Sequence, residues 1–170
     1  MDYEDIEKIV FGGGPNGSAA RASLGQITEE EHWHNVMKTL KLPAGEYKRV
    51  EKEFFAGDVL DRDLLDFIRS LKPKYKVGLI SNAWSGLRAF IERDKFAEVF
   101  DHMTISAEVG AAKPSAKIFQ IALEQFNVNA NEAVFVDDSI ENIEGCEKVG
   151  MKGIYFKDSE SAIKQLRTLL

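Results

Sequence analysis

The sequence predicts an α/β fold: a Rossmann-like parallel sheet with helices on both faces, preceded by a small helical part. Two observations lead to this prediction. From residue 75 onward, short apolar runs typical of buried strands alternate with helical segments, which is the pattern of βαβ units. Before residue 61, apolar side chains recur at helical spacing. We therefore expect a helical cap region at residues 1–60 and an α/β core at residues 61–170.

Composition excludes several classes of protein. The 28 acidic residues outnumber the 22 basic ones, and a net charge of −6 argues against binding to nucleic acid or anionic membranes. No apolar run approaches the roughly 20 residues of a membrane span, and the first residues do not resemble a signal peptide. The single cysteine, Cys146, excludes an internal disulfide framework. We expect a globular protein in a reducing, cytoplasmic setting, with no nucleic-acid or membrane partner.

The first eleven residues allow two interpretations. Ile6, Ile9 and Val10 have helical spacing, whereas residues 9–11 also form a short apolar run typical of a buried strand. Under either interpretation, the glycine-rich stretch at residues 12–18 then interrupts regular structure.

Three helices are predicted after this interruption. Thr28 and Glu31 have the spacing of a capping box, in which each side chain binds the backbone N–H of the other residue, so a helix begins here and continues to about Leu40. A proline suits the first turn of a second helix over residues 43–55. Asp61 is placed to cap a third helix.

The α/β core is predicted to contain four strands, each followed by a helix. The strands are expected at residues 75–80, 102–106, 133–136 and 153–156. The helices are expected near 84–94, from 115 to 126, up to about 149, and after 158. We predict that the four strands form one parallel sheet.

The residues that follow each strand are the candidate site, because ligands bind beyond the carboxyl ends of the strands in open parallel sheets. Ser81 and Asn82 follow the first strand, Lys113 lies in the loop after the second, and Asp137 and Asp138 follow the third. Taken singly, the serine or the second aspartate could be a helix cap, and the lysine a surface residue. Their joint occurrence at strand ends favours a functional site.

These residue types suit a phosphate and a magnesium ion. Two adjacent carboxylates supply the hard oxygen ligands that Mg²⁺ prefers. A serine hydroxyl and a backbone N–H donate to phosphate oxygens, and a lysine ammonium offsets the negative charge. Positioning and charge neutralisation dominate phosphoryl transfer, so the set predicts this chemistry.

Three segments also resemble a known family: residues 77–82, 110–119 and 134–145. They are similar to the second, third and fourth motifs of the haloacid dehalogenase superfamily of hydrolases, and the resemblance covers roughly residues 24–170. Residues 25–33 resemble the small helical cap that the family inserts after its first strand. The resemblance implies a hydrolase of small phosphorylated metabolites that uses Mg²⁺.

The resemblance also implies site roles. Phosphate binding would fall to Ser81, Asn82 and Lys113. Asp137 and Asp138 would hold the metal, and Asn142 would brace the metal-binding loop. Lys113 would also orient the nucleophile, which makes Lys113 and Asp137 the predicted catalytic residues.

The first family motif is missing from this sequence. Family members begin with a strand ending in Asp-x-Asp, whose first aspartate is the nucleophile. Asp61 and Asp63 have the Asp-x-Asp spacing, but they fall in a predicted helix. In one alignment, residues 1–23 belong to the cap and the first strand is absent. In the other, residues 7–11 replace that strand and Gly12 stands in the place of the nucleophile.

Three functions follow from these features. The first is a Mg²⁺-dependent phosphatase whose mechanism is atypical or impaired, with a metal-activated water or a substitute acid in place of the aspartate. The alternative is a non-catalytic, truncated relative that binds an anion or a partner. Dehalogenase chemistry ranks third, because it depends directly on the absent aspartate.

A homodimer is also predicted. In the family, the first strand lies between the strands predicted here at 75–80 and 133–136, so its absence leaves two apolar strand edges unpaired. Either these strands close up, or residues 6–11 fill the gap, or a second chain does. One such dimer would exchange N-terminal segments.

Overall fold

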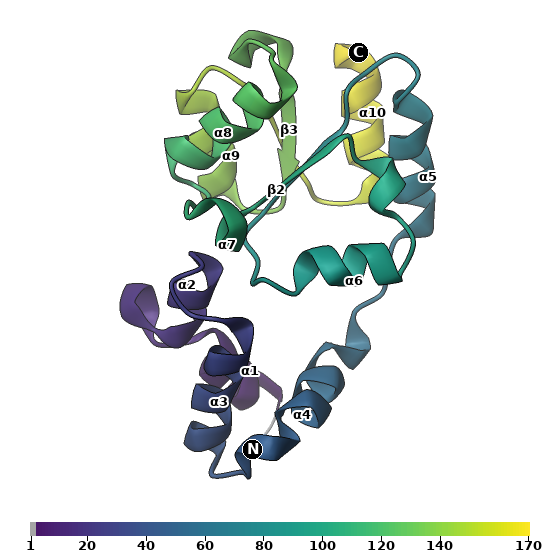
Figure 1. The fold of residues 1–170 in the computed structure, drawn as a ribbon. Helices are drawn as coiled ribbons and strands as arrows, with labels where there is room; N and C mark the ends of the chain where they lie inside the picture. The colour runs from purple at the N-terminus through teal and green to yellow at the C-terminus, as the bar shows by residue number, and fades with distance from the viewer. Residues whose placement is uncertain (1–2) are drawn as a thin grey trace.

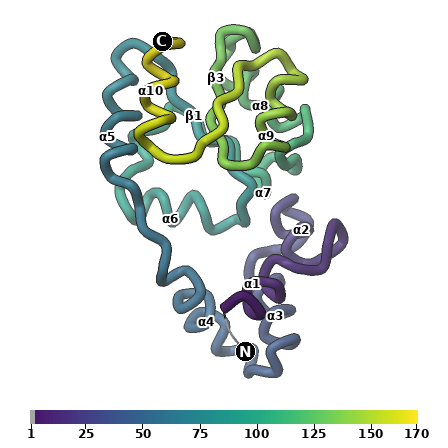
Figure 2. The backbone as a smooth tube through the Cα atoms, turned by 180° about the vertical axis from the view of Figure 1, so that it is seen from behind, coloured from purple at the N-terminus to yellow at the C-terminus, as the bar shows by residue number. Residues whose placement is uncertain are grey.

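The computed structural model describes residues 3–170 and shows a helical part joined to an α/β part. In Figure 1 the helical part lies below and the α/β part above. Figure 2 shows the segment between helices α4 and α5 running from one part to the other. No helix in the described part of the chain is both long enough and apolar enough to cross a bilayer. The domain boundary expected at residue 60 stays a prediction.

The helical part contains four α-helices and three short 3-10 turns. The helices are α1 (Tyr3–Phe11), α2 (Ser18–Ser23), α3 (Glu29–Leu40) and α4 (Tyr47–Phe54). The 3-10 turns are η1 (Gly14–Asn16), η2 (Ala44–Glu46) and η3 (Phe55–Gly57). The predicted capping box begins α3: the Thr28 hydroxyl accepts from the Glu31 N–H at 3.1 Å, and the Glu31 carboxylate accepts from the Thr28 N–H at 2.7 Å.

Helix α1 settles the interpretation of the first residues. The strand interpretation of residues 9–11 is wrong, and with it the alignment that placed Gly12 at the nucleophile position. Helical spacing prevails because it turns Val10 into the core of the helical part, where it is fully buried. Ile6 and Ile9 pack against the same cluster.

The α/β part follows the predicted order of strands and helices. The strands are β1 (Gly78–Ser81), β2 (His102–Ile105), β3 (Val134–Asp137) and β4 (Lys152–Tyr155). The helices are α5 (Arg62–Leu71), α6 (Leu87–Arg93), α7 (Ser106–Val109), α8 (Ala116–Phe126), α9 (Ile140–Lys148) and α10 (Ser159–Leu169), with 3-10 turns η4 (Ala97–Val99) and η5 (Ala130–Glu132). Asp61 caps α5 by accepting from the Leu64 N–H at 2.9 Å, so it is a capping residue rather than part of a catalytic pair.

The strands form two separate sheets, which corrects the prediction of one four-stranded sheet. β1 pairs with β2, and β3 pairs with β4, both in parallel. Within residues 3–170, β1 and β3 neither pair with each other nor receive residues 6–11 between them.

Helix packing joins the two sheets instead. Phe119 on α8 packs edge-to-face on Phe135 of β3, with ring centres 5.2 Å apart, and Ile143 and Cys146 of α9 belong to the same cluster. Ile80 of β1 packs against this cluster as well. The carboxyl ends of β1 and β3 therefore lie on the same rim without any strand pairing between them.

Candidate functional site

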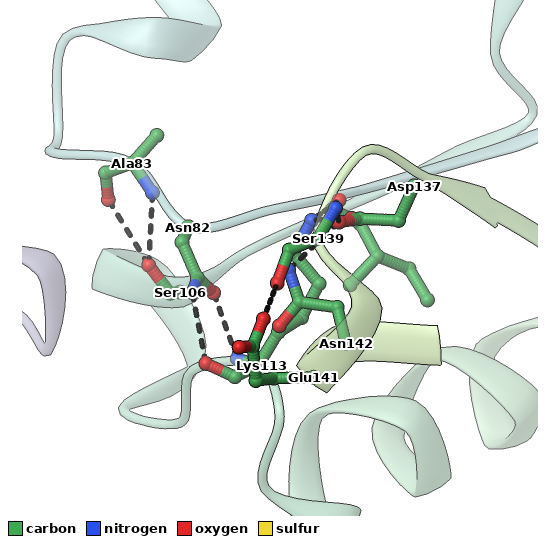
Figure 3. A network of polar contacts seen from close by, with 9 residues as sticks. Asn82, Ala83, Ser106, Lys113, Asp137, Ser139, Glu141 and Asn142 are labelled. Atoms are coloured by element: carbon green, nitrogen blue, oxygen red, sulfur yellow. Dashed lines mark hydrogen bonds and ion pairs between the residues drawn. The ribbon is translucent and has the colours of Figure 1, made fainter. Parts of the chain in front are cut away.

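A buried ion pair joins the two sheets at their carboxyl ends (Figure 3). The Lys113 ammonium donates to the backbone carbonyl of Ile80 on β1 at 3.1 Å and to Oδ2 of Asp137 on β3 at 2.6 Å. The two charged side chains are only 10% and 6% exposed. A charge pair this far from water needs further hydrogen bonds to hold its geometry.

Those bonds are present on the Asp137 carboxylate. Its other oxygen, Oδ1, accepts from the Ser139 N–H at 2.9 Å and from the Asn142 side-chain amide at 2.8 Å. Burial raises the pKa of Asp137, but the bonds from Lys113, Asn142 and Ser139 outweigh burial and hold that pKa below its ordinary value. Asp137 is therefore ionised at neutral pH, and Asn142 steadies it.

Asn82 fixes the backbone of Lys113. Its side-chain amide donates to the Lys113 carbonyl at 2.9 Å, and its carbonyl oxygen accepts from the Lys113 N–H at 2.7 Å. The structure thus gives Asn82 a positioning contact, whereas its predicted contact with phosphate stays a prediction. Ser81, which precedes it, is half-buried at the last position of β1.

Ser106 is a site residue that the sequence reasoning missed. Its hydroxyl accepts from the Ala83 N–H at 3.0 Å and donates to the Ala83 carbonyl at 3.2 Å. Ser106 follows β2 directly, as the residues of the Ser81 loop follow β1, so its position was the available signal. Sequence reasoning passed over it in favour of the loop that contains Lys113.

Asp138 stands beside the ion pair as an exposed carboxylate. It does not cap α9, because Ser139 occupies the cap position. The pair Asp137 and Asp138 fits a hydrated Mg²⁺, which needs only one or two protein carboxylates and keeps several waters. Residues 3–170 contain no cluster of three or more His, Cys, Asp or Glu side chains placed to hold a metal ion.

The structure brings together four of the six predicted site residues in one hydrogen-bonded network: Asn82, Lys113, Asp137 and Asn142. Ser81 and Asp138 are adjacent to members of this network in the chain. A surface hollow of about 550 Å³ lies along α8 and is lined by none of these residues.

Comparison with known proteins points to one family. The chain is 26% identical over 148 residues to a sesquiterpene phosphatase of Aspergillus oryzae, which covers 86% of this chain and 76% of that protein. It is 38% identical over 96 residues to a glyceraldehyde 3-phosphate phosphatase of Pyrococcus abyssi, but this match covers only 53% of the chain and 39% of that enzyme.

A solved structure and a family match complete the comparison. A haloacid dehalogenase family enzyme of Bacteroides thetaiotaomicron, in complex with magnesium and inorganic phosphate, has the same fold. Its TM-score is 0.80 at 22% identity, over 91% of this chain and 80% of that one. Residues 14–156 match the haloacid dehalogenase-like hydrolases. Because this match spans most of the sequence, the chain belongs to the haloacid dehalogenase-like hydrolase family.

Proposed function

We propose that the protein is a Mg²⁺-dependent phosphomonoesterase of small phosphorylated molecules. The observation that carries the proposal is the buried Lys113–Asp137 pair at the rim formed by the ends of β1 and β3. Two relatives named as phosphatases and a structural neighbour in complex with magnesium and phosphate support it.

The residues at the rim would have separate roles in phosphate binding, metal binding and positioning. Lys113 offsets the charge of the substrate phosphate, and Ser81 donates its hydroxyl to a phosphate oxygen. Asp137 and Asp138 would hold the metal. When bound, Mg²⁺ supplies charge neutralisation and lowers the pKa of a bound water. Asn82 keeps the Lys113 backbone in place, so the ammonium stays aimed at the rim.

With the residues that the structure describes, we propose that hydrolysis is slow and uses water as the nucleophile. Covalent catalysis needs a carboxylate in line with the leaving group. In the part of the chain that the structure describes, the Asp-x-Asp sequence formed by Asp61 and Asp63 lies at the start of α5. The Asp61 carboxylate caps that helix by accepting from the Leu64 N–H. Trapping of a phosphorylated aspartate, detected by mass spectrometry, would overturn the water mechanism.

Release of phosphate from p-nitrophenyl phosphate tests the proposal. We expect release that requires Mg²⁺, and we expect Lys113→Ala to weaken binding of inorganic phosphate by about tenfold or more, because it removes a charge-assisted contact. Lys117→Ala, an exposed lysine of the same segment, is the matched control and should leave phosphate binding unchanged.

A non-catalytic anion-binding protein is the second candidate. The observation that favours it is that both oxygens of the Asp137 carboxylate already accept hydrogen bonds from the protein, three in all, and so are engaged without a metal ion. An unchanged melting temperature in millimolar Mg²⁺ and no phosphate release, together with retained phosphate binding, would decide for this candidate.

We further propose a cytoplasmic homodimer. The support is that, among residues 3–170, β1 and β3 each pair along one edge only, and open strand edges favour self-association. Residues 6–11 belong to α1, so an exchanged N-terminal segment would be a helix. Light scattering at micromolar concentration should give twice the mass of the chain, and a clean monomer contradicts the dimer.

A further inference from the structure

Trp84 follows β1 in the chain, yet its side chain belongs to the helical part. It is nearly buried within the cluster formed by Val10, Trp33 and their neighbours. Its ring lies 4.2 Å from the His32 ring, 5.9 Å from Trp33 and 5.7 Å from Phe11, measured between ring centres. A side chain of the α/β part therefore completes the core of the other part.

A buried hydrogen bond fastens this indole. Trp84 Nε1 donates to the backbone carbonyl of Ala19 on α2 at 3.2 Å. Trp33 differs, because its buried Nε1 has no partner among the described residues. The indole N–H of Trp84 thus holds the two parts together, whereas that of Trp33 does not.

Three consecutive residues of the loop that carries Trp84 are each hydrogen-bonded to a different part of the chain. Asn82 is bound to the Lys113 backbone, Ala83 to Ser106 at the start of α7, and Trp84 to α2. Figure 3 shows the first two ties beside the Lys113–Asp137 pair. Because the three residues are consecutive, a shift of the helical part moves the loop that follows Ser81.

Two further close approaches join the helical part to the α/β part, one at a backbone carbonyl and one at the end of a glutamate side chain. An added Cβ at Gly25 would lie 2.2 Å from the Ala107 carbonyl oxygen, and one at Gly86 would lie 2.3 Å from Oε2 of Glu29. In the described chain the covalent link between the parts is the extended segment 58–61, where Val59 is almost fully exposed. Side-chain contacts must therefore set the relative position of the two parts.

We propose that Trp84 is a positioning residue that latches the helical part onto the α/β part and thereby sets the geometry of the Ser81–Ala83 loop. The latch stands on the contacts above. Its effect on phosphate rests on the proposed function. The latch and the phosphate effect are therefore measured separately.

Amide hydrogen exchange measures the latch in two variants. Trp84→Phe keeps a ring against His32 but loses the bond to Ala19, and we expect exchange at the α2 and Ser81–Ala83 amides to accelerate about fivefold. Trp84→Leu also removes the ring contacts, and about tenfold or more is expected. Trp33→Phe trims a fully buried ring of the same cluster without removing a hydrogen bond to α2, so exchange at both sets of amides should accelerate less than in Trp84→Phe. Amides of α8 and α9 report whether the α/β part stays folded.

Calorimetric titration with inorganic phosphate measures the positioning effect. We expect the dissociation constant to rise about fivefold in Trp84→Leu, less in Trp84→Phe, and least in Trp33→Phe. If the unmodified protein binds no phosphate, the proposed function fails, while exchange at Ser81–Ala83 still decides the latch. Should Trp84→Leu not fold, Trp84→Phe decides alone. If the amides of α2 and of Ser81–Ala83 exchange at the same rate in Trp84→Phe as in the unmodified protein, the proposal is wrong.

Discussion

Replacing Asp137 by Asn is expected to lower the free energy of unfolding by about 3–5 kcal/mol, because it leaves the Lys113 ammonium buried without a counter-charge. The ammonium lies between the Ile80 carbonyl and the Asp137 carboxylate, and the Lys113 side chain is only 10% exposed. The new amide also brings N–H groups toward Lys113 or Asn142, which are themselves donors at this site. Urea unfolding followed by circular dichroism at pH 7, without Mg²⁺, measures the loss.

Asp138→Asn is the matched control for this prediction. It makes the same chemical change on the neighbouring, exposed carboxylate, so the free energy of unfolding should stay within about 0.5 kcal/mol of the unmodified value. Adding Lys113→Met to Asp137→Asn should recover part of the loss, because the unpaired charge is then gone. Equal losses for the two asparagine variants would show that the ion pair does not stabilise the fold.

Comparing Asp137→Asn with Asp138→Asn also helps to measure Mg²⁺ binding. Both aspartates are proposed ligands, but a loss of activity in Asp137→Asn includes its effect on the ion pair. Asp138→Asn removes a ligand and leaves the pair intact, so its effect on Mg²⁺-induced stabilisation is the cleaner measure of metal binding.

Local patterns predicted the secondary structure because local interactions form it. The capping box at Thr28 and the cap at Asp61 each begin a helix at the expected position, and the last helix begins after residue 158 as expected. Strand β1 begins at Gly78 rather than at Tyr75, because the Tyr75 N–H donates to the Leu71 carbonyl at 2.8 Å and ends helix α5. Apolar side chains alone could not show where that backbone N–H binds.

Tertiary features were harder to predict. The strand-end rule placed Lys113 and Asp137 on one rim, and the structure confirms that they meet. Strand pairing depends on segments far apart in the chain, so the sequence pattern did not show that β1 and β3 stay apart. The bond from Trp84 to Ala19 joins residues 65 positions apart, and the local sequence pattern gave no sign of it.

Lowering the pH from 6.5 to 4 is expected to remove about 3 kcal/mol of stability through His32 alone. The ring is fully buried, with Nδ1 2.9 Å from the Ser18 hydroxyl and its face against Trp84. Burial lowers the pKa of His32 from the ordinary 6.5 to about 4. The unfolded chain therefore takes up a proton over this range while the folded chain does not. The stabilisation is complete above pH 6.5 and is lost progressively toward pH 4.

Comparing two histidine variants isolates this contribution from the carboxylates that titrate over the same range. His32→Phe keeps a ring against Trp84 but cannot bind a proton, so its unfolding free energy should fall less steeply below pH 6.5 than that of the unmodified protein. His34→Phe makes the same change at an exposed histidine two positions along α3 and is the matched control for the substitution itself. Denaturant unfolding at half-unit pH steps gives both slopes. Parallel curves for His32→Phe and the unmodified protein would mean that His32 does not enter the core as a neutral ring. Because the His32 ring contacts Trp84, a difference in slope would also place the pH-sensitive group at the contact between the helical part and the α/β part.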